Sequence, residues 1–367
     1  MILDADKKTK PSGPARLGAM LVFFLLAGCS IQPYRTVVVE GHRLHQRVDI
    51  PHIRHQTEIY EEISTGNWNN GGRITENLPN NTACRVKYHP SYRRKRWIVV
   101  EGTLGNGRKY PVVLDTGASP LLSINDIHIA ENKLAIHPLG ERTANAPSWG
   151  ISLIPKLQIS DITLLNWPCF YREQHMETQV FGLPVARGKA IIAGVPALRR
   201  FSYVAFDNTN EEVELSLKNQ FACDNPDLWS QYPFVIEEDL GGNAYLFVDI
   251  HVAGKQTRLQ LDTGSAMGLL LAEKLWEEIH QGVHRIKLKK AKDLYPYIGW
   301  FDCKKGVIRN LNVGGTIVRN AQISIFPDDS PLLEHCKGLL GMRYFRDSVV
   351  VLDFERSIMW VKKASSR

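Results

Sequence analysis

The stretch "PVVLDTGAS", Pro111–Ser119, places one aspartate at the end of a short apolar run. Its first four residues are typical of a β-strand, and the three residues after Asp115 are small, so the carboxylate would lie in a narrow turn. Asp-Thr-Gly is also an ordinary turn triplet, so a single copy indicates little. A second copy in "LQLDTGSA", Leu259–Ala266, makes the pattern informative.

The two triplets belong to a longer repeat with an offset of 147 residues (262 − 115). Residues 97–117, "WIVVEGTLGNGRKYPVVLDTG", align without a gap with residues 244–264, "AYLFVDIHVAGKQTRLQLDTG". Each copy has two apolar runs joined by a turn at Gly107 or Gly254, which is the pattern of a β-hairpin.

The repeat continues downstream of the triplets. "IIAGVPALRRFSYVAFD" resembles "GLLGMRYFRDSVVVLDF", and their glycines, Gly194 and Gly341, are again 147 residues apart (341 − 194). Three markers in one register predict a duplicated, β-rich lobe. Between them, residues 269–280, "LLLAEKLWEEIH", predict an amphipathic helix, and the counterpart after Asp115 looks shorter and less regular.

The doubled motif resembles that of the pepsin-like and retropepsin-like aspartic peptidases, over about residues 97–363. In that family each lobe contributes one Asp-Thr-Gly loop, and an apolar-apolar-Gly element packs beneath it. The resemblance implies a mainly β protein with two duplicated β-rich lobes of the acid-protease fold and a few short helices. One chain carries both lobes here, so we expect a monomeric active unit.

Paired aspartates suit the hydrolysis of peptide bonds. Two carboxylates within hydrogen-bonding distance share one proton, because both cannot be charged cheaply. The ionised one can then activate a water molecule, and the protonated one can act as an acid toward the carbonyl oxygen. The predicted catalytic residues are Asp115 and Asp262. By resemblance, the residues that support their loops are Thr116, Gly117, Thr263, Gly264 and Ser265.

The two loops differ three residues after the aspartate, where one has Ala118 and the other has Ser265. In pepsin-like relatives a hydroxyl at this position hydrogen-bonds its aspartate, and such a bond favours the charged carboxylate. We therefore expect Asp262 to be mainly ionised in the free protein and Asp115 to be mainly protonated.

Relatives in the family fold a β-hairpin flap over the substrate. The candidate flap residues are Trp149 in "APSWGIS", and Tyr295 and Tyr297 in "LYPYIGW". Pepsin-like flaps usually carry a tyrosine in the first lobe, where this chain has Trp149. These aromatic residues are equally consistent with positions in the core or between the lobes.

The N-terminus has the pattern of an export signal. Four cationic residues precede Leu17–Ala27, an uncharged run of 11 residues that is too short to span a bilayer comfortably. The run leads into "LAGC", which resembles the lipobox of bacterial lipoproteins and implies lipidation of Cys29. A plain secretory signal and a buried apolar helix are the alternatives. Ser30 is not the aspartate that retains lipoproteins in the inner membrane, so the resemblance favours the outer membrane, facing the periplasm.

These patterns divide the chain into four parts: residues 1–29 as lipoprotein signal peptide and lipobox, 30–83 as linker or possible prosegment, 84–222 as N-terminal lobe and 223–367 as C-terminal lobe. The linker carries four histidines, but no pattern of carboxylates or cysteines completes a metal site. No cofactor or metal is predicted. The four histidines are His42, His45, His52 and His55.

Charge and cysteine content limit the function classes further. The basic run Arg85–Arg96 predicts a solvated surface, with an anionic membrane surface as the alternative; no nucleic-acid-binding motif accompanies it. Setting Cys29 aside leaves an odd number of cysteines, so at least one thiol is free or pairs between molecules. Those five are Cys84, Cys169, Cys223, Cys303 and Cys336.

The sequence therefore predicts an exported, lipid-anchored aspartic endopeptidase whose partners are a polypeptide substrate and a membrane. The alternative is a catalytically inactive bilobal lipoprotein that binds peptides or envelope proteins, because a fold does not guarantee its chemistry. A structural envelope protein of two β-lobes is a third possibility, and it requires no pairing of Asp115 with Asp262.

Overall fold

The structure is a computed structural model, and it describes residues 30–35, 72–78, 83–90, 98–140, 149–173, 175–180, 183–239, 242–282, 286–295 and 299–362. The predicted leader, Cys29, the four linker histidines and Tyr297 lie outside the described residues. Among the described residues, no helix is long and apolar enough to cross a membrane.

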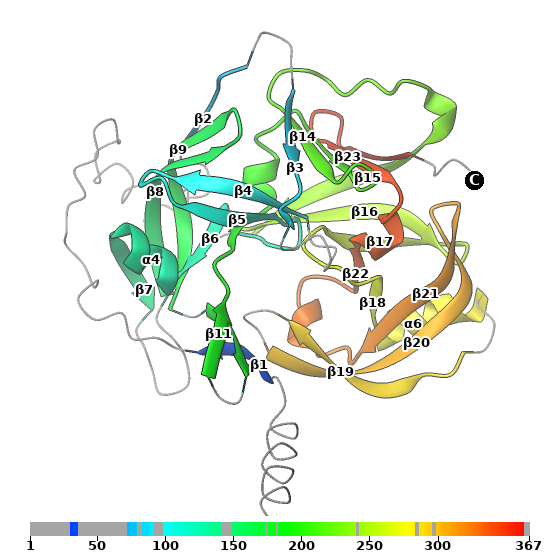
Figure 1. Cartoon of the computed structure of the whole chain (residues 1–367). Coiled ribbons are helices and arrows are strands. Elements are labelled where there is room, and N and C mark those ends of the chain that lie inside the picture. The colour runs from blue at the N-terminus through cyan, green and yellow to red at the C-terminus, as the bar shows by residue number, and fades with distance from the viewer. Residues whose placement is uncertain are drawn as a thin grey trace, which may run out of the picture.

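The first half of the chain builds an eight-stranded sheet in the order β2-β9-β6-β12-β5-β4-β8-β7 (Figure 1). Two short helices, α4 (Asp126–Asn132) and α5 (Val195–Leu198), accompany it. The strands are β2 (Arg73–Glu76), β4 (Val99–Leu104), β5 (Lys109–Leu114), β6 (Leu122–Asn125), β7 (Ile136–Gly140), β8 (Trp149–Ile159), β9 (Ile162–Arg172) and β12 (Ile191–Ala193).

A thirteen-stranded sheet runs through the second half in the order β19-β20-β21-β18-β22-β17-β16-β15-β24-β23-β13-β14-β3. Its strands are β3 (Cys84–Lys87), β13 (Tyr203–Asp207), β14 (Glu212–Ser216), β15 (Trp229–Glu238), β16 (Ala244–Val252), β17 (Lys255–Asp262), β18 (Leu269–Ala272), β19 (Lys289–Tyr295), β20 (Gly299–Val313), β21 (Thr316–Phe326), β22 (Gly338–Gly341), β23 (Val349–Asp353) and β24 (Ile358–Lys362). The short helices here are α6 (Glu273–Ile279), η2 (Pro226–Leu228), η3 (His280–Gly282), η4 (Pro331–Leu333) and η5 (Met342–Phe345).

A third, three-stranded sheet joins β1 (Ser30–Arg35) to the hairpin of β10 (His175–Val180) and β11 (Leu183–Arg187). Strand β1 runs antiparallel to β10, with Ser30 opposite Gln179. Residues 30–83, predicted as linker, thus contain β1 and also β2, which pairs with β9.

The predicted repeat is present in the strand registers. Leu114 of β5 lies beside Ala193 of β12, and Leu261 of β17 lies beside Leu340 of β22, in parallel pairs. Each residue of the second pair lies 147 positions after its counterpart in the first pair (261 − 114 and 340 − 193). The hairpin turns before them contain Gly107 and Gly254 at φ 81° and 85°, a backbone conformation that favours glycine.

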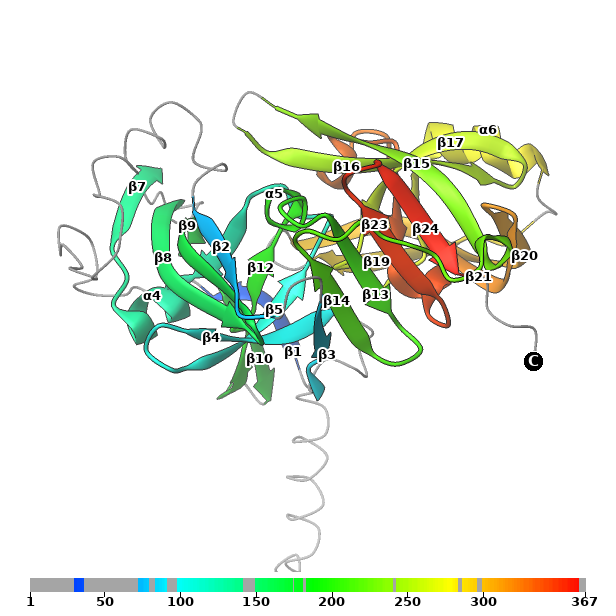
Figure 2. The same cartoon turned by 90° about the horizontal axis from the view of Figure 1, so that it is seen from above.

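The two halves meet toward the β3 end of the long sheet, where β13 pairs antiparallel with β23 and Ala205 lies opposite Val351 (Figure 2). The order β3-β14-β13 on one side mirrors β15-β24-β23 on the other. Strands β3, β13 and β14 come from residues 84–222 yet share the sheet of the second half, so this sheet crosses the predicted lobe boundary.

Two predictions about helices are wrong. Residues 269–280 do not form one helix, because Leu269–Ala272 is the buried strand β18 between β21 and β22, and only Glu273–Ile279 is helical. A fully buried strand shows no alternation, so its sequence can be mistaken for a helix. The first-lobe counterpart is not shorter: α4 has seven residues, as α6 does, and begins 147 residues earlier (273 − 126).

Candidate active site

The two Asp-Thr-Gly loops begin at equivalent strand ends. Asp115 directly follows β5 and its amide donates to the Ala193 carbonyl at 2.9 Å. Asp262 is the last residue of β17 and lies beside Gly341. Each loop then turns sharply, since the amide three residues on donates back to the aspartate carbonyl at 3.2 Å, from Ala118 in one loop and from Ser265 in the other.

Reciprocal threonine hydrogen bonds join the two loops. The Thr116 amide donates to the Thr263 hydroxyl at 2.9 Å, and the Thr263 amide donates to the Thr116 hydroxyl at 3.0 Å. Each hydroxyl in turn donates to a carbonyl of the opposite half, Leu261 or Leu114, at 2.7 Å. Both threonines are fully buried, so these bonds hold the loops at a fixed separation.

The glycines let the carboxylates come together. A Cβ placed on Gly117 would lie 2.6 Å from the Asp262 carboxyl carbon, and a Cβ on Gly264 would lie 2.3 Å from that of Asp115. Each aspartate therefore rests against the glycine of the opposite loop, and a larger residue would displace it. The Gly117 amide also donates to Asp115 Oδ1 at 2.8 Å.

The apolar-apolar-Gly elements support the loops from beneath, as predicted. Val195 donates its amide to the Ala118 carbonyl, and Met342 donates its amide to the Ser265 carbonyl, both at 3.0 Å. A side chain on Gly194 would come within 2.4 Å of the Ala118 carbonyl oxygen, so the close approach requires glycine.

The electrostatics of the pair follow from burial and from mutual contact. Desolvation raises the pKa of both aspartates, and the two carboxyls hydrogen-bond each other. Backbone amides oppose this rise at both residues: those of Gly117 and Gly264 at Asp115, and those of Ser265 and Gly264 at Asp262. Repulsion from the charge of Asp115 adds to desolvation and raises the pKa of Asp262 well above its usual value. Both side chains keep partial exposure, so water or a substrate can reach them. Such a pair holds one proton between two oxygens.

The predicted location of that proton stays a prediction. Burial raises the pKa of both aspartates and backbone amides in both loops oppose the rise, so the shared proton belongs to the pair and not to one member. The Ser265 hydroxyl, on which the prediction depends, accepts a hydrogen bond from the Met267 amide at 3.1 Å.

The flap candidates lie in hairpins, but they differ in their surroundings. Trp149 begins β8 and is 42% exposed, with its ring centroid 5.8 Å from that of Phe170 on the same sheet. Tyr295 ends β19 and packs edge-on against Phe301 and Phe326. Burial raises the pKa of Tyr295, and so do the negative charges of Asp293 and Asp262.

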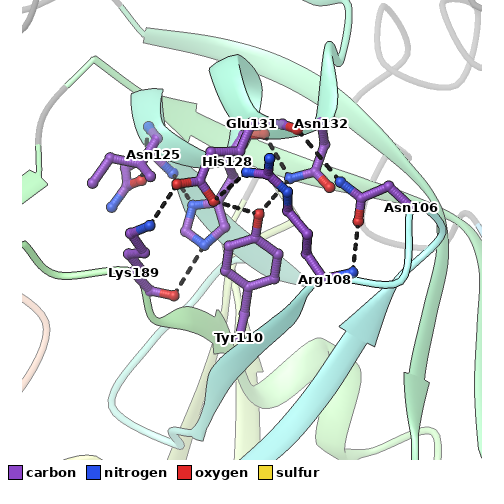
Figure 3. A network of polar contacts seen from close by, with 9 residues as sticks. Asn106, Arg108, Tyr110, Asn125, His128, Glu131, Asn132 and Lys189 are labelled. Atoms are coloured by element: carbon purple, nitrogen blue, oxygen red, sulfur yellow. Dashed lines mark hydrogen bonds and ion pairs between the residues drawn. The ribbon is translucent and has the colours of Figure 1, made fainter.

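Helix α4 carries a polar network that the sequence analysis did not predict (Figure 3). At its centre, fully buried His128 accepts the Asn125 amide at Nδ1 and donates from Nε2 to the Lys189 carbonyl, both at 3.1 Å. Burial lowers the pKa of His128 to about 4, so the ring is neutral near pH 7. Glu131 on the same helix pairs with the Lys189 ammonium group and accepts the Tyr110 hydroxyl at 2.7 Å. The sequence signal was an asparagine three residues before a histidine at a helix start.

Within the described residues, no group of three or more His, Cys, Asp or Glu side chains is arranged to hold a metal ion. The five cysteines of the described part are free thiols: Cys84, Cys169, Cys223, Cys303 and Cys336.

No protein-family model and no curated protein sequence matches the chain. Among solved structures, it is similar to the crystal structure of an aspartic proteinase from Irpex lacteus, with 12% identity and a TM-score of 0.43 over 77% of this chain and 98% of that chain. It is also similar to the crystal structure of Basic 7S globulin from soybean, with 12% identity and a TM-score of 0.40 over 81% of this chain and 96% of that chain. The predicted mainly β class with two duplicated β-rich halves and a few short helices is confirmed by the elements themselves and by strand registers that repeat at an offset of 147 residues (261 − 114 and 340 − 193).

Proposed function

We propose that this protein is an exported, lipid-anchored aspartic endopeptidase that uses Asp115 and Asp262 as its catalytic pair. One observation carries the proposal: two partly exposed carboxyls hydrogen-bond each other across loops that buried Thr116 and Thr263 lock together. Keeping two like charges together lowers stability, and a protein that only bound peptides would have no need of the pair.

The proposed reaction uses the proton that the pair shares. The ionised aspartate takes a proton from a water molecule as the water oxygen attacks the peptide carbonyl carbon, and the protonated aspartate gives its proton to the carbonyl oxygen. The resulting gem-diol collapses as the C–N bond breaks. The leaving nitrogen takes the proton from the first aspartate, and the second aspartate recovers its proton from a diol hydroxyl. No bound cofactor takes part in this scheme.

The proposed location rests on the N-terminal pattern. Cys29 is the lipidated residue, and the protein faces the periplasm from the outer membrane of a Gram-negative-type bacterium. Support comes from the lipobox and from Ser30, which directly follows the cysteine.

Substitution of each aspartate tests the chemistry. Asp115→Asn and Asp262→Asn are each expected to reduce hydrolysis of a casein or peptide-library substrate by about 10²–10⁴-fold, because base and acid act together. Asp161→Asn, at an exposed position in the β8–β9 turn, is the matched control and should retain full hydrolysis.

The rival function gives a different result in the same assay. If wild type binds peptides with an affinity that Asp115→Asn leaves unchanged, yet cleaves none of them between acidic and neutral pH, the protein is a peptide-binding lipoprotein.

A further inference from the structure

The β19–β20 hairpin carries an unusual concentration of positive charge. Residues 286–305 contain six lysines and two aspartates. Lys305 pairs with buried Asp293, and Lys304 pairs with Glu273 of α6 at 2.6 Å. The other four lysines are all exposed, and one of them, Lys292, lies 3.6 Å from exposed Asp302 across the hairpin. The four are Lys287, Lys289, Lys290 and Lys292.

The hairpin also presents a large aromatic side chain beside these lysines. Trp300 is 54% exposed and lies opposite Leu294 near the hairpin end. Lys290 and Lys292 lie on the same face of β19 as Leu294, because side chains two residues apart along a strand share a face. Trp300 is paired with Leu294 and so lies on that face too. Lysine beside tryptophan suits a lipid–water interface, where ammonium groups meet phosphates and the indole lies at headgroup depth.

Protection of a sheet edge is the ordinary explanation for such lysines, since β19 is the edge strand of its sheet. The other lobe provides an internal comparison. Its hairpin strand β7 is also an edge strand, yet Ile136–Gly140 contains no lysine or arginine. The fold therefore does not require a basic edge here, and edge protection gives no reason to expose Trp300.

The N-terminal strand lies on the same side of the molecule. Figures 1 and 2 both place β1 beside the end of the β19–β20 hairpin. Strand β1 begins at Ser30, so Cys29 is one residue, about 3.8 Å of chain, from a strand that β10 holds in place. A lipid on Cys29 would thus bring this basic hairpin to the membrane surface.

We infer that the outward face of the β19–β20 hairpin is a second membrane contact, which binds the anionic phosphate headgroups of the bilayer to which Cys29 attaches. The inference rests on the proposed lipidation of Cys29, and it adds an orientation to the anchoring. Each lysine near an anionic surface contributes about 1 kcal/mol, so the contact strengthens as the fraction of anionic lipid rises.

Lysine footprinting of the full-length lipidated protein tests the contact. The protein is reconstituted into vesicles of phosphatidylcholine alone or with phosphatidylglycerol, treated with an amine-acetylating reagent, and read by mass spectrometry. We expect Lys290 and Lys292, which share the face of Trp300, to react about fivefold more slowly on the anionic vesicles, and high salt to remove the difference. Lys87 on β3, the opposite edge strand of the same sheet, should react equally on both.

Charge reversal supplies the matched variants. Quenching of tryptophan fluorescence by brominated lipid should be larger in the parent than in Trp300→Phe, and the Lys290→Glu/Lys292→Glu variant should lose this difference. Reversal of Lys87 and Lys109, whose side chains are about as exposed as that of Lys292, should retain it.

Equal acetylation on both vesicle types overturns the inference. A second contrary outcome is that an acidic peptide in detergent protects these lysines and anionic vesicles do not. That result would make the hairpin a peptide-binding surface. Hydrolysis in detergent is measured separately. Lipid-dependent protection without any hydrolysis would reject the proposed peptidase and retain the membrane contact.

Discussion

At the scale of single residues, the aspartate pair depends on two threonines that make no contact with a substrate. Thr116→Val preserves shape but leaves the Thr263 amide and the Leu261 carbonyl without partners in a buried site. Unsatisfied buried groups cost about 1–3 kcal/mol each, so we expect unfolding in urea to lose about 2–4 kcal/mol. Thr116→Ser keeps both bonds and should lose about 1 kcal/mol for one methyl group. Equal losses in the two variants would show that packing, and not hydrogen bonding, holds the loops.

The pair also predicts how stability changes with pH. The pKa of Asp262 is higher in the folded than in the unfolded protein, so its contribution is fully present below the unfolded pKa, near 3.8, and is lost as pH rises through the raised value. Asp262→Asn removes this loss. Its stability relative to wild type should therefore increase between pH 4 and pH 7, measured by thermal unfolding. A difference that stays constant over this range would mean that Asp115 and Asp262 do not share a proton.

At the scale of elements, α4 and α6 occupy equivalent places but bury different chemistry. His128 in α4 corresponds to Leu275 in α6 (275 − 128 = 147), so the fold itself does not demand a buried histidine. The ring must be neutral, because Nδ1 accepts the Asn125 amide and protonation would abolish that bond. Lys189 and Arg108 lie around the same network and further disfavour a charged ring, whereas Glu131 favours it.

Helix α4 therefore limits the stability of the fold at acidic pH. Burial lowers the pKa of His128 from 6.5 to about 4, so its contribution is present above the unfolded value and is lost as pH falls toward 4. The shift corresponds to about 3 kcal/mol of unfolding free energy. In His128→Leu, which copies the other lobe, stability should no longer decrease between pH 6.5 and pH 4, although it starts lower. A wild-type pH dependence in that variant would assign the acid limit to other groups.

The elements also show which predictions the sequence could support. Hairpins entering each triplet were predictable, because glycine turns and apolar runs repeat at one offset in residues 97–117 and 244–264. Helix α4 was not predictable, because Asn125 and His128 interrupt its apolar periodicity. Their side chains hydrogen-bond the carbonyls of Gly188 and Lys189, which come near only when the chain folds. The hydrogen bonds from backbone amides to Asp115 were not predictable for a similar reason: folding alone brings the Gly264 amide of the other half to this carboxyl.

At the scale of the whole molecule, the proposed anchor and the folded body can be separated by mutation. Cys29→Ala should release the protein from the membrane fraction or leave it unprocessed, and abolish incorporation of labelled palmitate. Cys223→Ala, a partly exposed thiol, is the control and should stay membrane-bound and labelled. A processed, labelled Cys29→Ala protein in the membrane fraction would contradict lipidation at this residue.

The reciprocal contacts between the halves have a consequence for the history of the chain. Thr116 bonds Thr263 as Thr263 bonds Thr116, and β13 pairs with its own counterpart β23. This is the form of an isologous dimer interface, contained within one polypeptide. Two identical subunits would have to carry every feature twice. Fusion of the two halves into one chain removes that constraint. Among the described residues, the β10–β11 hairpin belongs only to the first half and the basic strand β19 only to the second.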